Sequence, residues 1–217
     1  MHNKSSAILS TTYFGPVQWY QKLYRYDSVL IEHYETFPKQ TYRNRCLIAT
    51  TNGVQALTIP VCHASEPSYI HHPISTIHQK ISDHGNWRHL HWQALQSAYG
   101  ESPFFEYYED DIRPFFTERN WERLVDYNDA ICQKMCELLD IHPNISATTD
   151  YTPSTIHHPL SPINDFREVI NPKHPGDDAD FQPRPYYQVY QQKHGFLPNL
   201  SILDLLFNMG PESIFYL

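Results

Sequence analysis

The chain has 217 residues, a formal charge of −8 and 41% hydrophobic residues, which fits one large domain with enough apolar side chains for a core. The acidic balance argues against nucleic acid as a partner, because binding to a phosphate backbone normally requires a broad basic surface. No stretch of the sequence approaches the ~20 apolar residues of a membrane span, and the first residues are too short an apolar run for a signal peptide. We therefore expect a cytoplasmic protein without a membrane span.

The N-terminal part of the chain predicts a strand, a helix and a second strand. Residues 7–13 are mostly apolar or β-branched and indicate a buried strand. Pro16 favours the start of a helix over residues 17–24, because proline fits the first helical turn. Residues 28–32 are largely apolar and indicate the second strand. This order predicts two parallel strands joined by a crossover helix.

A β-hairpin is the clearest element further along. Two apolar runs, residues 45–50 and 54–61, flank Asn52-Gly53, and Asn-Gly is the strongest short signal for a hairpin turn. Thr117 is a good N-cap for a long helix that follows it. The other expected elements are strands at 74–77, 80–82, 144–149 and 186–190 and helices at 87–99, 118–139 and 200–207.

These elements predict an α/β fold with a mixed, mostly parallel central sheet, a β-hairpin and flanking helices. Residues 152–185 are rich in Pro, His and Asp, which indicates a loop or a partly ordered linker. We expect an α/β core domain at residues 1–151. Residues 152–217 would form a loop-rich C-terminal extension packed on that core.

A cationic cluster stands out on this acidic chain. Lys39, Arg43 and Arg45 fall within seven residues, together with Tyr42 and Asn44. The cluster favours an anion site for phosphate or carboxylate, because Arg offers planar paired donors and Lys a point charge. A solvated strand end with ordinary ion pairs accounts for the same residues about equally well. If the site exists, we expect it at the mouth of the central sheet.

Other residues could complete such a site. The first strand is followed by Tyr13, Phe14 and Gly15, and backbone N–H groups after Gly15 could point at a phosphate from the start of the next helix. Asp150 follows the strand expected at 144–149, at the edge where ligands bind in open α/β sheets. Trp87 or Tyr42 could provide a surface on which a ring stacks.

Two histidines are candidate general bases. His33 directly follows the second predicted strand and is the best-placed titratable group. His91 lies on the apolar stripe of the helix at 87–99, where a hydrogen-bonded core histidine is the commoner role. Asn128 lies on the apolar stripe of the long helix, where it either ties helices together or faces a polar pocket.

The sequence indicates no metal site, and it leaves any cofactor unknown. The chain has fourteen histidines and four cysteines but no known ligand spacing, and no disulfide framework. Cys132 and Cys136 lie on one side of a helix, and two buried small hydrophobes explain them better than a metal pair. A Gly-rich phosphate loop and a Gly-x-Ser-x-Gly nucleophile turn are also missing from the sequence.

Several segments, taken in order, resemble the WbqC-like protein family. They cover nearly the whole chain apart from residues 152–185, and their ordered series is more specific than any one of them. One departure lies after the second strand, where a paired acid of the family appears here as Glu32-His33. The segments are Tyr13-Phe-Gly-Pro16, Asp27-Ser-Val-Leu-Ile-Glu32, Lys39-Gln-Thr-Tyr-Arg-Asn-Arg45, Leu57-Thr-Ile-Pro60, Trp87-Arg-x-x-His91, Ala98-Tyr99, Pro103-Phe-Phe105 and Ser201-Ile-Leu-Asp-Leu-Leu206.

The resemblance implies a role in the biosynthesis of bacterial surface polysaccharide, including O-antigen. It also implies a transferase that attaches amino-acid or acyl groups to amino sugars. The expected substrate is a small anionic molecule, a nucleotide-linked or phosphorylated sugar. Lys39, Arg43 and Arg45 would bind its anionic oxygens, and Asn44 would orient a hydroxyl or amide.

The alternative is a non-catalytic binding or scaffold protein of the same pathway. The sequence shows no recognised nucleophile or metal set, and the apolar segment at 200–207 could dock a partner. The sequence does not name the donor or the acceptor, and assembly as a homo-oligomer is left open.

Overall fold

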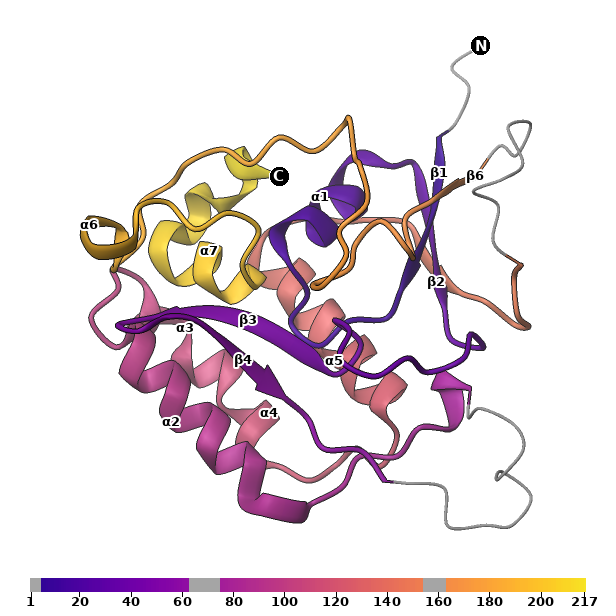
Figure 1. The fold of residues 1–217 in the computed structure, drawn as a ribbon, viewed down its shortest axis with the longest axis horizontal. Coiled ribbons are helices and arrows are strands. Elements are labelled where there is room, and N and C mark those ends of the chain that lie inside the picture. The colour runs from indigo at the N-terminus through magenta and orange to yellow at the C-terminus, as the bar shows by residue number, and fades with distance from the viewer. Residues whose placement is uncertain (1–4, 63–74, 154–162) are drawn as a thin grey trace.

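A parallel sheet forms the centre of the fold. The computed structural model describes residues 5–62, 75–153 and 163–217, and Figure 1 shows the arrangement of their elements. In this part of the chain, β1 (Ser6–Ser10) pairs in parallel with β2 (Ser28–Glu32) and β6 (Ile163–Asp165), and β2 pairs with β5 (Ile145–Ala147). The strand order is β5-β2-β1-β6. The predicted α/β class with a mostly parallel sheet is confirmed.

The strand register decides which residues meet at the carboxyl edge of the sheet. Ser10 of β1 pairs with Glu32 of β2, and Ile8 pairs with Asp165 of β6. The carboxyl ends of these strands, and the residues that follow them, therefore lie at one edge. From β1 the chain crosses to β2 on one side, whereas β6 pairs with the other side of β1. The strand order therefore changes direction at β1, and ligands bind at such points in open α/β sheets.

The helices α1 (Val17–Arg25) and α5 (Leu124–Leu138) lie on the same side of the sheet (Figure 1). Trp19 of α1 and Ile131 of α5 are both buried in the main core, together with Ile31 of β2. Burial of apolar side chains from both helices against the sheet stabilises this layer by roughly 25 cal/mol per Å² removed from water.

The predicted hairpin is confirmed. β3 (Arg45–Thr50) pairs antiparallel with β4 (Gly53–Thr58), and Gly53 has a φ of 97°, which glycine adopts without strain. Figure 1 shows the hairpin between α7 (Ile202–Met209), drawn in yellow, and α2 (Trp87–Tyr99). Arg45 and Thr58 are partners at its open end, and Thr50 and Gly53 are partners at the turn.

The long helix expected at 118–139 was wrong in its first part. α4 (Pro114–Thr117) ends where that helix should begin, and α5 starts only at Leu124. Pro114 at the first turn explains the start of the short helix. The Thr117 hydroxyl donates back to the carbonyl of Arg113 at 3.2 Å and so does not cap a following helix.

Three smaller expectations also fail. The strand expected at 74–77 begins outside the described residues, and its described part contains the 3₁₀ turn η2 (Thr76–His78). Residues 80–82 contribute only isolated bridges, and residues 186–190 form no strand. The remaining elements are η3 (His84–Asn86), α3 (Phe105–Ile112), α6 (Gln191–His194) and η4 (Gly210–Tyr216).

The C-terminal segment contributes to the sheet and to the core. β6 lies after residue 151, where the predicted core domain ends, yet it forms hydrogen bonds with β1 inside that domain. The division of the chain at residue 151 stays a prediction. Four apolar residues of α7 have no exposed surface, and the segment expected to dock a partner instead packs on its own chain. These residues are Leu203, Leu205, Leu206 and Phe207.

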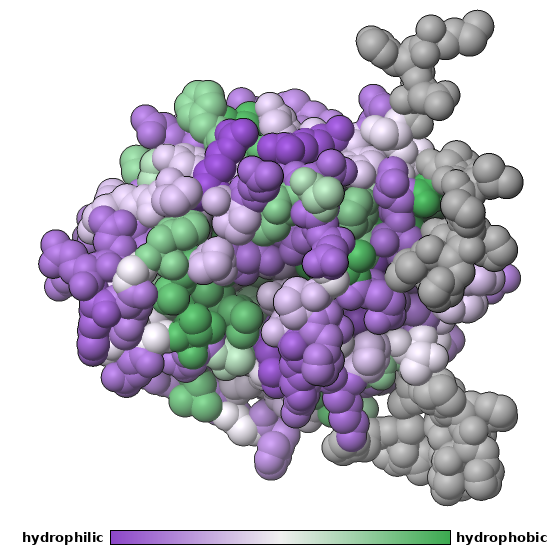
Figure 2. Space-filling view, turned by 45° about the horizontal axis from the view of Figure 1, so that its top comes forward, coloured by the Kyte–Doolittle hydropathy of each residue, from purple (hydrophilic) through white to green (hydrophobic). Residues whose placement is uncertain are grey.

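The face drawn in Figure 2 is mainly hydrophilic, with a hydrophobic group on its left half. This agrees with a mean hydropathy of −0.55. Within residues 5–62, 75–153 and 163–217, no helix has the length and apolar character needed to cross a bilayer.

Candidate functional site

A network of buried charges lies at the carboxyl edge of the sheet. Arg43 is only 5% exposed, and its Nε and Nη2 atoms lie 2.8 and 2.6 Å from the two carboxylate oxygens of Glu35. Arg43 Nη2 also donates to the hydroxyl of Ser10, the last residue of β1, at 2.7 Å. The paired geometry is the one in which Arg binds carboxylates most strongly. The predicted cation therefore reaches the mouth of the sheet, but a protein carboxylate already neutralises it.

A second buried arginine, which the sequence did not suggest, completes the network. Arg167 follows β6 and donates to both carboxylate oxygens of Asp165, at 2.9 and 2.6 Å. Its Nη1 lies 3.4 Å from Glu32 Oε2 and donates to the carbonyl of Thr152 at 2.6 Å. Glu32 is fully buried and accepts further hydrogen bonds from the backbone of Tyr34 and Thr152 and from the Thr148 hydroxyl. The network ties β1, β2, β5 and β6 together at this edge.

Next to this network, a cavity of about 730 Å³ opens between α5 and the strands β2 and β5; we call it cavity 1. Its size is that of a typical small-molecule site. Residues after β1 and β2 and along α5 line it, and its walls combine apolar and polar side chains. The residues used below are Thr12, Trp19, His33, Asn128, Asp129 and Glu137.

His33 and Asp129 form the chemical centre of cavity 1. His33 Nε2 lies 3.3 Å from Asp129 Oδ1, and His33 is 6% exposed whereas the Asp129 side chain is 50% exposed. The contact is close enough for charge attraction, although the angle is not that of a hydrogen bond. A carboxylate beside an imidazole orients the ring, and such a pair is the arrangement in which histidine acts as a general base.

Three polar atoms of the cavity lining are buried without a hydrogen-bond partner among the described residues. They are Thr12 Oγ1, Asn128 Oδ1 and His33 Nε2. The Asn128 amide donates to the carbonyl of Arg43 at 2.8 Å, so this residue both ties helix to loop and faces the cavity. A buried polar group without a partner costs about 1–3 kcal/mol. These atoms therefore favour a bound molecule that supplies partners.

The cationic cluster does not converge on one point. Arg43 joins the buried network, whereas Lys39, Asn44 and Arg45 line a second cavity of about 700 Å³, which we call cavity 2. Arg43 and Arg45 separate where β3 begins. Arg45 is the first residue of β3 and pairs with Thr58 of β4, whereas Arg43 precedes the strand. Among the residues described, neither Lys nor Arg lines cavity 1.

The first loop has few free donors for an anion. The N–H of Val17 donates to the carbonyl of Leu200 at 3.0 Å, and that of Gln18 to Asn199 Oδ1 at 2.9 Å. Both groups begin α1, so the C-terminal segment satisfies the helix end that could otherwise bind a phosphate. A Cβ on Gly15 would lie 2.4 Å from Thr12 Oγ1, so Gly15 allows the close approach of Thr12.

The aromatic candidates lie in the core. Tyr13 and Phe14 have no exposed surface, and Trp87 is 4% exposed with its indole N–H donating to the carbonyl of Ser82. Tyr42 is 7% exposed, and burial raises the pKa of its hydroxyl to about 12. Asp150 is exposed beyond β5 and accepts from the backbone of Tyr151. Neither cavity 1 nor cavity 2 is lined by any of these residues.

His91 lies in the same aromatic group and not beside His33. Its Nδ1 is 2.9 Å from the Tyr13 hydroxyl, and its ring packs against Trp87. Burial lowers the pKa of His91 to about 4, because an apolar surrounding disfavours the charged imidazole. His91 is thus held neutral in the folded protein at neutral pH.

This burial predicts a loss of stability in acid. The unfolded chain protonates His91 below about pH 6.5, whereas the folded protein does so only near pH 4. The contribution of neutral His91 to the free energy of unfolding is therefore complete above pH 6.5 and falls as the pH drops toward 4. We expect the protein to lose about 2 kcal/mol more than a His91→Gln variant between pH 7 and pH 4.5, measured by urea denaturation. Equal losses of stability in the wild-type protein and the variant would contradict the assignment of His91 as a buried, neutral histidine.

Sequence reasoning missed Arg167, Asp165 and Asp129. Arg167 and Asp165 fall in a segment that looked like a linker, and no local pattern shows that it adds a strand to the sheet. Asp129 follows Asn128, and the polar residue on an apolar helical stripe was the available signal for a polar pocket there. Cavity 1 also brings in Thr12 and Trp19, which the sequence did not single out.

The fold and this edge define an α/β protein with a parallel sheet and a cavity of mixed polar and apolar lining beside the ends of β1 and β2. Residues 11–169 and 173–216 match the model of the WbqC-like protein family, and the chain belongs to that family. The chain is also 26% identical over 235 residues to an uncharacterized protein, Rv1507c, of Mycobacterium tuberculosis; the alignment covers 99% of this chain and 97% of that protein. No solved structure matches the chain.

Proposed function

We propose that this protein is a transferase of bacterial surface polysaccharide biosynthesis, including O-antigen, which acts on a nucleotide-linked or phosphorylated amino sugar. The His33–Asp129 pair inside cavity 1 is the observation that supports it most. In this proposal the sugar binds in cavity 1 and the transferred unit is an acyl or aminoacyl group. Membership of the WbqC-like family is consistent with the proposal and does not specify the reaction.

The charge of cavity 1 favours an amine on the substrate. Among the described lining residues the ionisable groups are two acids, Asp129 and Glu137, two histidines and two cysteines, without a Lys or Arg. Asn128 Oδ1 adds an unpartnered acceptor, and the Thr12 hydroxyl adds a group that can accept or donate. A cavity rich in acceptors and negative charge attracts a ligand with donors and positive charge, such as an ammonium group among sugar hydroxyls.

In the proposed reaction, His33 acts as the general base. The ammonium group of the bound sugar first loses one proton to water and becomes an amine. His33 then removes a proton from the amine as its nitrogen attacks the carbonyl carbon of an activated acyl donor. A bond forms between nitrogen and carbonyl carbon, and the bond between that carbon and its activating group breaks. Asp129 stabilises the protonated imidazole, which then returns the proton to the leaving group or to water.

A matched pair of ligands tests the proposal. Glucosamine 1-phosphate and glucose 1-phosphate differ only at C2, where the first carries an amine and the second a hydroxyl. We expect the wild-type protein to bind the amine form at least tenfold more tightly by calorimetry. The Asp129→Asn variant should lose most of that preference, because the amide keeps the shape and removes the charge. Equal affinity for both sugars in the wild-type protein would exclude an amine site. Binding without acylation by any activated donor would indicate the non-catalytic binding protein instead.

A further inference from the structure

Cavity 2 lies at the open end of the hairpin, away from the His33–Asp129 pair. Lys39, Asn44 and Arg45 line it together with Thr58 of β4 and with Ser82 and His84 before α2. Its volume of about 700 Å³ is far more than an inorganic phosphate needs and falls in the range of small-molecule sites. Apolar residues, among them Ile59, supply part of its wall.

The charge of cavity 2 is opposite to that of cavity 1. Lys39, Arg45 and His84 line it, and no Asp or Glu is found among its described lining residues. The Arg45 Nε atom donates to the Thr58 hydroxyl at 3.0 Å, and within the described chain neither Arg45 nor Lys39 forms an ion pair. On a protein with a formal charge of −8, two such cations at one cavity form a local positive field.

A buried amide gives cavity 2 a second, independent feature. Asn44 is 6% exposed, and its amide nitrogen donates to the carbonyl of Ile59 at 2.8 Å. Its carbonyl oxygen, Oδ1, has no partner among the described residues. The backbone of Asn44 is fixed on both sides, since its N–H donates to Thr41 and its carbonyl accepts from Ile59. The unpartnered oxygen favours a ligand with an N–H or O–H donor.

We infer that cavity 2 binds a nucleoside diphosphate, free or as part of a larger molecule. Arg45 and Lys39 bind the phosphate oxygens, Asn44 accepts from a base or ribose donor, and the apolar wall holds the base. Arg suits this task because its planar donors match two phosphate oxygens. The inference extends the proposed function but rests on the residues of cavity 2 alone, and it does not require the amino-sugar reaction in cavity 1.

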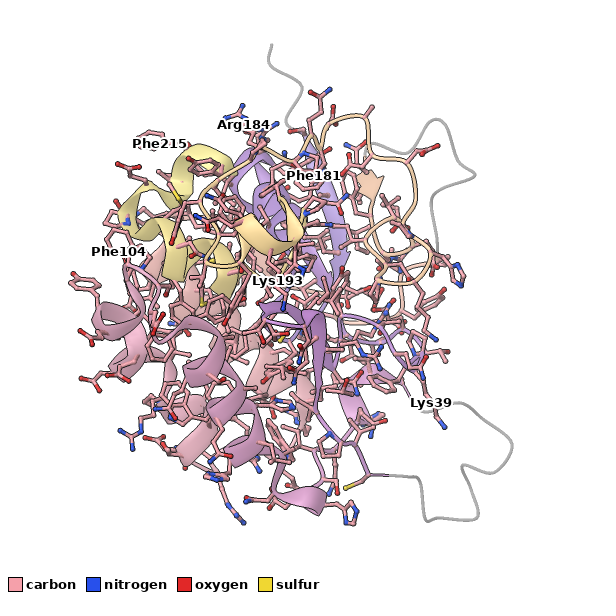
Figure 3. The ribbon with its side chains drawn as sticks, turned by 60° about the vertical axis from the view of Figure 1, so that its left-hand side comes forward. Lys39, Phe104, Phe181, Arg184, Lys193 and Phe215 are labelled. Atoms are coloured by element: carbon pink, nitrogen blue, oxygen red, sulfur yellow. The ribbon has the colours of Figure 1, made fainter. Side chains whose placement is uncertain are left out.

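The test measures binding of uridine diphosphate and of inorganic pyrophosphate by calorimetry. We expect uridine diphosphate to bind more tightly than pyrophosphate, and Arg45→Ala to weaken its binding about tenfold or more. Lys39→Ala should weaken it about threefold, because Lys39 is exposed and its charge is partly screened. Figure 3 shows Lys39 at the edge of the molecule, so this second variant leaves the core intact.

Lys193→Ala is the matched control, since it removes the same charge elsewhere. Lys193 donates to the carbonyl of Thr51 at the hairpin turn, opposite the open end where Arg45 pairs with Thr58. Figure 3 shows Lys193 well separated from Lys39. The control should bind uridine diphosphate like the wild-type protein. Equal affinity for pyrophosphate would overturn the nucleoside part of the inference. No binding at millimolar ligand, or binding unchanged in both Arg45→Ala and Lys39→Ala, would overturn it entirely.

Discussion

Replacement of His33 by Gln should lower the turnover of the proposed acyl transfer by about 10²–10⁴-fold, the usual contribution of a positioned general base. Gln keeps a hydrogen-bonding side chain of similar reach but cannot take up the proton of the amine. The affinity for the amino sugar should change much less, because Asp129 and the acceptors of cavity 1 remain. The measurement is kcat for N-acylation of glucosamine 1-phosphate, followed by mass spectrometry with acyl-coenzyme A and aminoacyl-adenylate donors.

His174→Gln is the control for this prediction. His174 is exposed in the loop after β6 and does not line cavity 1, so the same chemical change should leave turnover within about twofold of wild type. Thermal melting of both variants separates a catalytic loss from unfolding. A His33→Gln enzyme that folds and turns over within threefold of wild type would remove His33 from the reaction.

Replacement of Arg167 by Met should destabilise the protein by about 3–5 kcal/mol, the usual cost of leaving buried charges without their partner. Arg167 is 6% exposed and contacts both Asp165 and Glu32. Met retains much of the side-chain volume, so the loss reports the uncompensated carboxylates and not a large cavity. Urea denaturation at pH 7 measures the free energy of unfolding.

The exposed pair Arg123–Asp126 provides the comparison. Its side chains are 48% and 41% exposed, and Arg123→Met should cost between about 0 and 1 kcal/mol, because water screens the pair. Equal losses in the Arg167 and Arg123 variants would mean that the network at the sheet edge contributes no more than a surface ion pair. A large loss for Arg167 alone would establish the network as the tie between β6 and the rest of the sheet.

Much of the N-terminal fold could be predicted, because its signals are local. The alternation of strand, Pro-started helix and strand, and the Asn52-Gly53 turn, each depend on residues close together in sequence. The short strand β6 could not, because its three residues acquire strand structure only by pairing with β1, more than 150 positions earlier. The boundary between α4 and α5 could not be predicted either. The Thr117 hydroxyl can cap a following helix or donate to the carbonyl of Arg113 in the preceding turn, and the sequence favours both equally.

The candidate site, too, could be predicted only in part. Sequence position suggested His33, because a residue that directly follows a parallel strand must lie at the carboxyl edge of the sheet. The partner of His33 could not be identified, since Asp129 reaches cavity 1 from a helix almost a hundred residues later. The cationic cluster was visible as charge, but charge alone does not say which way each side chain points.

The sequence by itself determined the α/β class, the hairpin, the strand that presents His33 and the presence of unusual positive charge near residue 43. Only the tertiary structure decided that Arg43 is neutralised by Glu35, that Arg45 and Lys39 turn to a different cavity, and that Asp129 joins His33. The physical reason is that secondary structure follows from neighbouring residues, whereas a cavity is formed by side chains that meet only after distant segments have packed.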